Sequence, residues 1–530
     1  MRCKSTTFLT NSQMLLKYLT YLPRMRNIPN NDENGRFFNS TLSRLFFSSY
    51  LCDKNMMMWT KPYGMKEGFL IGGGLVIVGL ILELSVGPVD WDAFRWPVNG
   101  IALAGFLALI AIIFQLRKRV SIFQFLGTYK AAIPALVYAV VLTIIMGLTR
   151  QEINGTWLSN MLSFWPFVLI YVYMALILGL TVLRQLKSWA AAKFSILHSP
   201  FSILSHFGLF LAMTTATLGN ADMQRVKMIT VKGMPEWRAL TPQQLIVELP
   251  FTIELKEFVM ETYANGSPKR FASDIQIQTK TGKSIQTTIE VNKPVEVDGW
   301  KIYQYGYDTQ MGTMSQTSIL ELISDPWLPL VYTGIYMMLA GALLMMLRAI
   351  PWRQGVQQSR KHPKSALLLC AVVAACFFCV HHFMPILHSD TLVPALQSPW
   401  FKPHIIAYML AYTLMASAAL IAMYLLLRSK QGSLANLVIV GIALITFGML
   451  FGALWAKEAW GHYWSWDPKE TWAAITWFSY LVYVHYRQIP THKPKLAWWV
   501  LIISFILLQM CWWGIKFLPA AQGSSVHVYS

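Results

Sequence analysis

Apolar runs of roughly 20 residues recur along most of this chain, separated by short polar segments. A helix needs about 20 consecutive apolar residues to cross a bilayer, so each run predicts a membrane helix. We predict about eleven such helices, at approximately 67–86, 99–116, 131–149, 163–183, 201–219, 327–347, 366–387, 404–427, 434–454, 471–487 and 496–515. The predicted fold is therefore a polytopic all-α membrane protein, apart from one polar region.

That polar region, residues 220–324, has a different pattern from the rest of the chain. Apolar residues alternate with polar ones, as at Ile275 and Ile277, and turn residues such as Gly282 and Gly299 separate the alternating stretches. Alternation of this kind, bounded by turns, is typical of antiparallel strands with one buried face. We therefore predict one small β-rich domain outside the membrane.

Composition and charge agree with a membrane protein. Hydrophobic residues make up 55% of the chain and charged residues 13%, whereas soluble proteins carry about 25% charged residues. The net charge of +19 is concentrated in Lys and Arg clusters in every second connection between predicted helices, for example at 117–119 and 348–364. Basic loops face the cytoplasm, so we expect the β-rich domain and the C-terminus on the opposite side. The clusters reflect membrane topology, so we expect no nucleic-acid partner.

Two further segments carry weaker signals. Residues 1–55 contain no spanning run and precede Met56-Met57-Met58, so we expect a disordered or non-native N-terminal extension, with translation starting near Met56. Cys376 and Cys379 have CxxC spacing inside an apolar run. A thiolate would be poorly solvated there, which favours buried inert thiols and leaves a redox pair as the alternative.

Six tryptophans fall within residues 455–477, around the predicted helix start on the side of the β-rich domain: Trp455, Trp460, Trp464, Trp466, Trp472 and Trp477. Asp467, followed by Pro468 and Glu470, predicts an N-cap with a capping box, so a helix should begin rigidly at Asp467. The preceding tryptophans should then form a fixed platform, whose flat indole faces suit a large planar ligand. A structural aromatic cluster at the membrane edge remains the alternative.

Four histidines are candidate metal ligands because of their positions. His404 begins a predicted helix and His527 follows the last one, which places both on the side of the tryptophans. His206 and His485 are expected at matching depth near the cytoplasmic ends of their helices. Neutral imidazole is a common axial ligand of heme iron, and ionisable groups within membranes are functional candidates. Packed or interfacial histidines are the alternative for each residue.

The stretch from Trp460 to Trp472 (WGHYWSWDPKETW) resembles the WWD signature of the System II cytochrome c biogenesis proteins CcsA or ResC. The segment 397–404 and the region of His527 are also similar to that family, although this chain has Val-His-Val-Tyr where the family usually has Leu-His-Ser-Tyr-Gly. The N-terminal half resembles the partner subunit, CcsB or ResB, at 205–208, 291–304 and 325–326. The resemblance implies a natural fusion of both subunits over roughly residues 56–530.

The resemblance also implies a domain plan. After the extension at 1–55, ResB-like membrane helices occupy 56–219, the extracytoplasmic β-rich domain 220–324 and a final ResB-like helix 325–350. A CcsA-like membrane domain follows at 351–530, with the WWD loop at 455–477.

The implied function is that of a cytochrome c heme lyase in a bacterial inner membrane, with heme b as substrate and bound ligand. His206 and His485 would bind heme from the cytoplasmic side, and His404 and His527 would ligate its iron on the periplasmic side. The WWD role would fall to Trp460, Trp464, Trp466, Asp467 and Trp472. Lys457 and Lys469 either pair with heme propionates or are solvated loop lysines.

The implied partners are apocytochrome c, a thioredoxin-like extracytoplasmic thiol reductant and the lipid bilayer. We expect no catalytic residue beyond those that position heme. A heme exporter or chaperone that delivers heme to a separate ligase is the alternative function. A bis-histidine electron carrier to quinone is a weaker alternative, because it would bury both hemes between helices.

Overall fold

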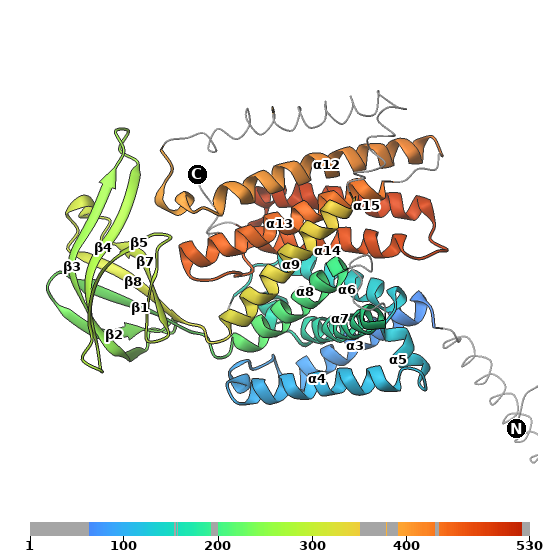
Figure 1. The fold of residues 1–530 in the computed structure, drawn as a ribbon, viewed down its shortest axis with the longest axis horizontal. Helices are drawn as coiled ribbons and strands as arrows, with labels where there is room; N and C mark the ends of the chain where they lie inside the picture. The colour runs from blue at the N-terminus through green and yellow to red at the C-terminus, as the bar shows by residue number, and fades with distance from the viewer. Residues whose placement is uncertain are drawn as a thin grey trace, which may run out of the picture. The chain divides into compact units, whose positions relative to one another are not determined.

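The computed structural model describes residues 63–152, 155, 157–191, 200–349, 378, 391–429 and 434–521. Four predictions lie outside the described residues: the extension at 1–55, the membrane helix at 366–387, the thiols Cys376 and Cys379, and the placement of His527. The predicted fold class is confirmed, because the described chain combines long apolar helices with one antiparallel β domain (Figure 1).

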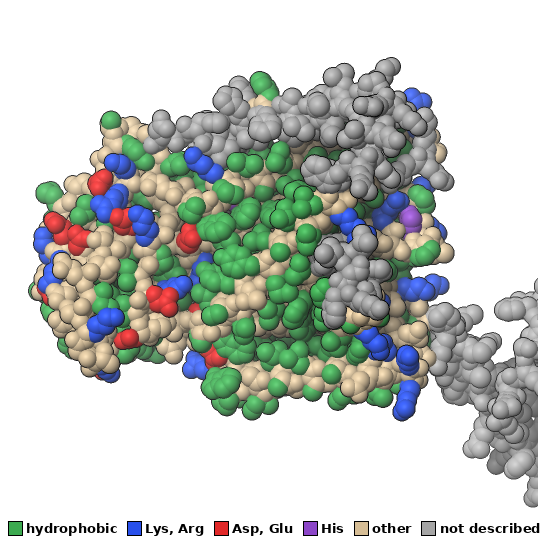
Figure 2. Space-filling view, in the orientation of Figure 1, with side chains coloured by type: hydrophobic (Ala, Val, Ile, Leu, Met, Phe, Trp, Pro, Cys, Tyr) green, Lys and Arg blue, Asp and Glu red, His purple; other side chains and the backbone are tan. Residues whose placement is uncertain are grey.

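Within the described ranges, nine helices are long and apolar enough to cross a membrane. They are α3 (Met65–Val86), α4 (Val98–Leu116), α6 (Tyr129–Leu148), α7 (Trp165–Ala191), α8 (Pro200–Gly219), α9 (Leu328–Ala349), α12 (Phe401–Leu427), α13 (Ala435–Trp460) and α15 (Pro494–Trp512). The short helix α5 (Ser121–Leu126) connects α4 to α6. Hydrophobic side chains spread over the helices on the face shown in Figure 2, as expected for surface in contact with lipid.

The predicted helix at 471–487 is present as α14 (Pro468–Arg487), but it is not one of these nine apolar helices. It carries charged residues at both ends, including Glu470 and Arg487. Most of its side chains are nevertheless buried, because α14 packs against α6, α13 and α15. Most of its surface therefore contacts other helices and not lipid, so α14 can be less apolar than the other long helices.

The β domain is an eight-stranded antiparallel sheet in the order β5-β4-β3-β2-β1-β8-β7-β6. The strands are β1 (Gln224–Val231), β2 (Pro235–Leu240), β3 (Ile246–Thr262), β4 (Pro268–Thr279), β5 (Ser284–Glu290), β6 (Val295–Val297), β7 (Trp300–Tyr307) and β8 (Thr317–Ser324). Ile275 and Ile277 are fully buried, which confirms the predicted alternation. Ser273 in β4 donates to Gln304 in β7, so distant strands face each other across a shared core.

The two connections between the helices and the sheet are held together by one carboxylate. Asp222, between α8 and β1, accepts hydrogen bonds from the Trp327 indole (2.7 Å) and the Asn99 amide (2.8 Å). It also accepts one from the backbone N–H of Trp96 (2.7 Å). Because Trp327 lies between β8 and α9, this cluster joins the entry and the exit of the β domain.

Candidate functional site

Two of the predicted ligands, His206 in α8 and His485 in α14, lie side by side. Their ring centroids are 6.3 Å apart and their ring planes differ by 82°. A metal ion held between two imidazoles by metal–nitrogen bonds of about 2 Å separates the ring centres by roughly 6 Å. The spacing of this pair therefore fits two axial ligands of one iron atom.

The hydrogen bonds of this pair fix which nitrogen of each ring carries the proton. Nδ1 of His206 lies 2.6 Å from the carbonyl oxygen of Ser202, and Nδ1 of His485 lies 2.8 Å from that of Leu481. A carbonyl oxygen can only accept, so each Nδ1 donates and each Nε2 carries the lone pair. Metal-bound histidines are oriented in the same way. Gln185 adds an outer contact, because its amide donates to the Ser202 hydroxyl (2.9 Å).

His404 lies in the first turn of α12 and packs against a glycine face of α13. Its Nδ1 is 2.7 Å from the carbonyl oxygen of Gly448, so Nε2 again carries the lone pair. A Cβ atom at Gly452 would lie only 2.7 Å from the same Nδ1. The Gly448-xxx-Gly452 spacing allows close helix packing. This spacing could have indicated the packing site of His404 from the sequence, but it was not recognised there.

The Trp455 indole packs beside His404 on the α13 side. The ring centroid of the buried Trp455 is 5.7 Å from that of His404 and 5.1 Å from that of Trp460. The Trp455 indole N–H donates to the carbonyl oxygen of Ala395 (2.7 Å). The structure thus brings one predicted iron ligand together with the beginning of the tryptophan-rich stretch.

The loop between α13 and α14 is shorter than the sequence pattern indicated. Helix α13 continues through Trp460 and ends at Gly461, whose φ of 76° is left-handed. Helix α14 begins after Asp467, whose carboxylate accepts from the backbone N–H of Glu470 (2.8 Å). Glu470 in turn accepts from the backbone N–H of Ser465 (2.7 Å). The predicted capping box is confirmed, and it fixes the end of a loop of only a few residues.

The remaining tryptophans divide between the loop and the core. Trp464 and Trp466 lie edge to face in the loop, with ring centroids 5.7 Å apart. Trp466 has a φ of 57°, a conformation that is strained for a bulky residue and that clusters at functional sites. Its ring packs against Phe167 of α7. Trp472, by contrast, is buried at Gly147 of α6 and does not share the loop surface.

Lys457 is not a solvated loop lysine, which corrects one of the two expectations for it. Its side chain is 2% exposed, lies 3.6 Å from the Asp325 carboxylate and donates to the carbonyl oxygen of Gly461 (2.9 Å). Tyr463 lies nearby, and burial raises the pKa of its hydroxyl above the ordinary value. Lys469 is exposed in the first turn of α14. Through its two contacts, Lys457 joins the loop between α13 and α14 (residues 461–467, the tryptophan loop) to the connection between β8 and α9.

Comparison with known proteins adds two family matches. The cytochrome C assembly protein family matches residues 331–521, and the ResB-like family matches residues 181–318. The chain is 30% identical to the cytochrome c biogenesis protein CcsA of Zea mays, over 32% of this chain and 69% of that protein. It is 34% identical to CcsA of Chlamydomonas reinhardtii, over 27% of this chain and 43% of that protein.

These matches confirm the resemblance that the tryptophan stretch and the N-terminal motifs predicted. They cover α14 and the tryptophan loop in one match, and His206 and most of the β domain in the other. The chain belongs to the CcsA family of cytochrome c biogenesis proteins, in a form that fuses the ResB-like (CcsB) and CcsA parts of System II in one polypeptide.

Proposed function

We propose that this protein is a cytochrome c synthase, or heme lyase, which carries heme b across the membrane and attaches it to apocytochrome c. The observation that carries the proposal is the pair His206 and His485. Their ring centroids are 6.3 Å apart, and each Nδ1 is bound to a carbonyl oxygen. A half-buried pair whose Nε2 atoms carry the lone pairs suits heme iron, and the protein belongs to a family with a role in cytochrome c biogenesis.

We assign the membrane to the bacterial inner membrane, with the β domain, the tryptophan loop and the C-terminus on the periplasmic side. The supporting observation is the distribution of basic residues, which cluster in the connections at the opposite helix ends, such as 117–119 and 184–193. His206 and His485 then bind heme arriving from the cytoplasm. His404 and His527 hold its iron on the periplasmic side.

The tryptophan loop presents heme to the incoming protein. Trp460, at the end of α13, and Trp464 and Trp466, in the loop, offer indole surface to the porphyrin. Asp467 and Trp472 hold the loop through the helix cap and the core contact with α6. Apocytochrome c supplies Cys-x-x-Cys-His, and its histidine replaces one of the two periplasmic iron ligands.

The bond-forming step is an addition. Each cysteine sulfur bonds to one carbon of a heme vinyl group and the thiol proton goes to the other carbon, so two thioethers form without net oxidation. The protein lowers the barrier mainly by positioning the reactants. Both cysteines must arrive as thiols, so the proposal includes a separate thioredoxin-like reductant on the periplasmic side.

The test is co-expression with an apocytochrome c in a host that lacks its own maturation system. We expect covalent heme on the reporter, measured by heme staining after denaturing electrophoresis. His404→Ala and His527→Ala should each lower the product by about ten-fold or more, as expected when a positioning contact is lost. His492→Ala is the matched control, because His492 contacts Arg487 and the carbonyl oxygen of Ile489 outside the proposed sites, and it should leave the yield unchanged.

Two other outcomes would change the conclusion. Heme in the purified protein without covalent product on the reporter would indicate a heme exporter or chaperone. Absence of any Soret absorption in protein from heme-replete cells would reject heme handling by these histidines altogether.

A further inference from the structure

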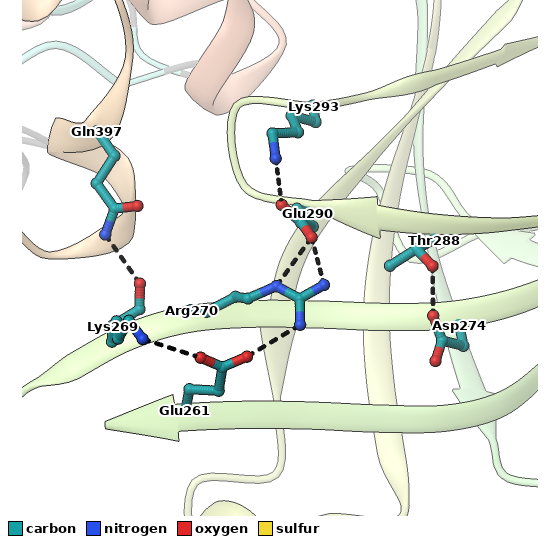
Figure 3. A network of polar contacts seen from close by, with 8 residues as sticks. All are labelled: Glu261, Lys269, Arg270, Asp274, Thr288, Glu290, Lys293 and Gln397. Atoms are coloured by element: carbon teal, nitrogen blue, oxygen red, sulfur yellow. Dashed lines mark hydrogen bonds and ion pairs between the residues drawn. The ribbon is translucent and has the colours of Figure 1, made fainter. Parts of the chain in front are cut away.

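The β domain contacts the segment that leads into α12, residues 391–400, which we call the lead segment. The contact joins the ResB-like region to the CcsA-like region, and part of it is drawn in Figure 3. Three hydrogen bonds form it: the Tyr263 hydroxyl to the Leu392 carbonyl (3.0 Å), the Asn292 amide to the Pro394 carbonyl (2.7 Å), and the Gln397 amide to the Lys269 carbonyl (2.8 Å).

The β-domain side of this contact lies at strand ends that several ion pairs connect. Tyr263 follows β3, and Asn292 lies in the turn between β5 and β6 with a φ of 66°, a conformation that asparagine tolerates well. Charged residues tie these strand ends together: Arg270 bridges Glu261 and Glu290, Lys269 pairs with Glu261, and Lys293 pairs with Glu290 (Figure 3). The sheet's three bonding groups, the Tyr263 hydroxyl, the Asn292 amide and the Lys269 carbonyl, therefore lie at strand ends that these ion pairs connect.

The other side of the lead segment is held by α13. The Ser398 hydroxyl and the Trp400 indole N–H donate to the two carboxylate oxygens of Glu458, at 3.0 and 2.8 Å. The Trp455 indole N–H donates to the carbonyl oxygen of Ala395. The ring of Trp455 also packs beside His404 and Trp460. A continuous series of contacts thus runs from the sheet, through the lead segment and Trp455, to the predicted iron ligand.

We infer that the β domain positions His404, and that Tyr263, Asn292 and Gln397 are positioning residues for this ligand. The inference rests on the proposed function, because it takes His404 to bind heme iron. An iron ligand must be held within about 0.5 Å of its productive position by the residues around it. The lead segment runs directly into α12, whose first turn carries His404. Releasing the segment therefore displaces the first turn of α12 and the imidazole with it.

The experiment removes the three donors while keeping the shape of each side chain. The variants are Tyr263→Phe, Asn292→Asp and Gln397→Glu, singly and combined, in the full chain. Asn292→Asp keeps a residue that tolerates the left-handed backbone. The control is Thr288→Val, which removes the hydrogen bond from Thr288 to Asp274 in the same sheet, away from the lead segment (Figure 3).

Three quantities are measured: the visible spectrum of heme in the purified protein, its reduction potential, and the covalent heme on the reporter cytochrome. We expect each single variant to lower the product about two- to five-fold and the combined variant about ten-fold or more, as hydrogen bonds of ordinary strength imply. The combined variant should also shift the potential and show loss of an axial ligand, because axial ligation sets both. The Thr288→Val control should match the wild type.

The outcomes separate the two proposals. If His404→Ala alters the spectrum and the potential but the combined variant does not, the positioning role is wrong and the proposed function stands. A lower product yield with an unchanged spectrum would also reject the positioning role. If His404→Ala itself changes neither spectrum nor potential, the proposed ligand role fails first.

Discussion

At the scale of single residues, Asp222 shows how one carboxylate secures two chain connections. It accepts from Asn99, the Trp96 amide and the Trp327 indole. We expect Asp222→Ala to destabilise the protein by roughly 1–3 kcal/mol, because the buried Asn99 amide and the half-buried Trp327 indole lose their acceptor. Thermal unfolding of the detergent-solubilised protein, followed by tryptophan fluorescence, measures the loss.

The control is Asp92→Ala, which removes an exposed ion pair with Arg95 and should cost less than about 1 kcal/mol. Burial favours a higher pKa for Asp222, but the hydrogen bonds from Asn99, Trp96 and Trp327 outweigh it and hold the pKa below its ordinary value of 3.8. Its stabilising effect is therefore complete above pH 3.8 and is lost as pH falls through the lower, folded-state pKa. An equal loss of stability in both variants at neutral pH would contradict this account.

At the scale of elements, the packing of α12 on α13 depends on two glycines. A Cβ atom at Gly452 would meet the His404 ring at 2.7 Å, and one at Gly448 would meet the Tyr408 ring at 2.8 Å. We expect Gly452→Ala to cost about 1–3 kcal/mol by overpacking, and to perturb the proposed iron ligand. The unfolding temperature measures the first effect, and the visible spectrum of bound heme the second.

Gly74→Ala in α3 is the matched control for this substitution. No atom lies within 4 Å of a Cβ at Gly74, and alanine favours a helix over glycine by about 1 kcal/mol. The control should therefore be neutral or slightly stabilising, with an unchanged spectrum. A Gly452→Ala variant that behaves like the control would show that the contact with His404 is not required.

The elements themselves could be predicted from the sequence to a large extent, because each depends on local pattern. Apolar length predicted nine described membrane helices, alternation predicted the β domain, and Asp467 with Glu470 predicted the cap of α14. The predicted end of α13 was wrong, because Trp455 and Trp460 were assigned to a loop but are helical. Tryptophan is compatible with both states, and the left-handed Gly461 is what ends the helix.

At the scale of the whole molecule, the contacts between the two regions could not be predicted. The motifs around Asn292 and Gln397 were visible separately, but nothing in either indicates that both take part in one interface. The sequence placed His206 and His485 at matching depth and the family resemblance implied a shared heme site, whereas their distance and orientation come from the structure. Lys457 looked like a loop lysine because its partner, Asp325, lies far away in the sequence.

The buried pair of Lys457 and Asp325 gives the test at this scale, because it joins the tryptophan loop to the ResB-like half. The two side chains are 2% and 6% exposed and 3.6 Å apart. Removing one partner of a buried pair costs about 3–5 kcal/mol, because the other charge stays buried, while an apolar replacement of both costs much less. We therefore expect Lys457→Met and Asp325→Leu each to lower the unfolding temperature more than the double variant does.

A double-mutant cycle measures the interaction free energy between Lys457 and Asp325 directly, since the two side chains are in contact. Lys457 also donates to the carbonyl oxygen of Gly461, so Lys457→Met should release the loop start in the single and the double variant alike. Stability should then recover in the double variant while covalent heme on the reporter stays low. Additive losses of stability would show that the two charges act independently, and full recovery of product would show that the Gly461 contact does not hold the loop.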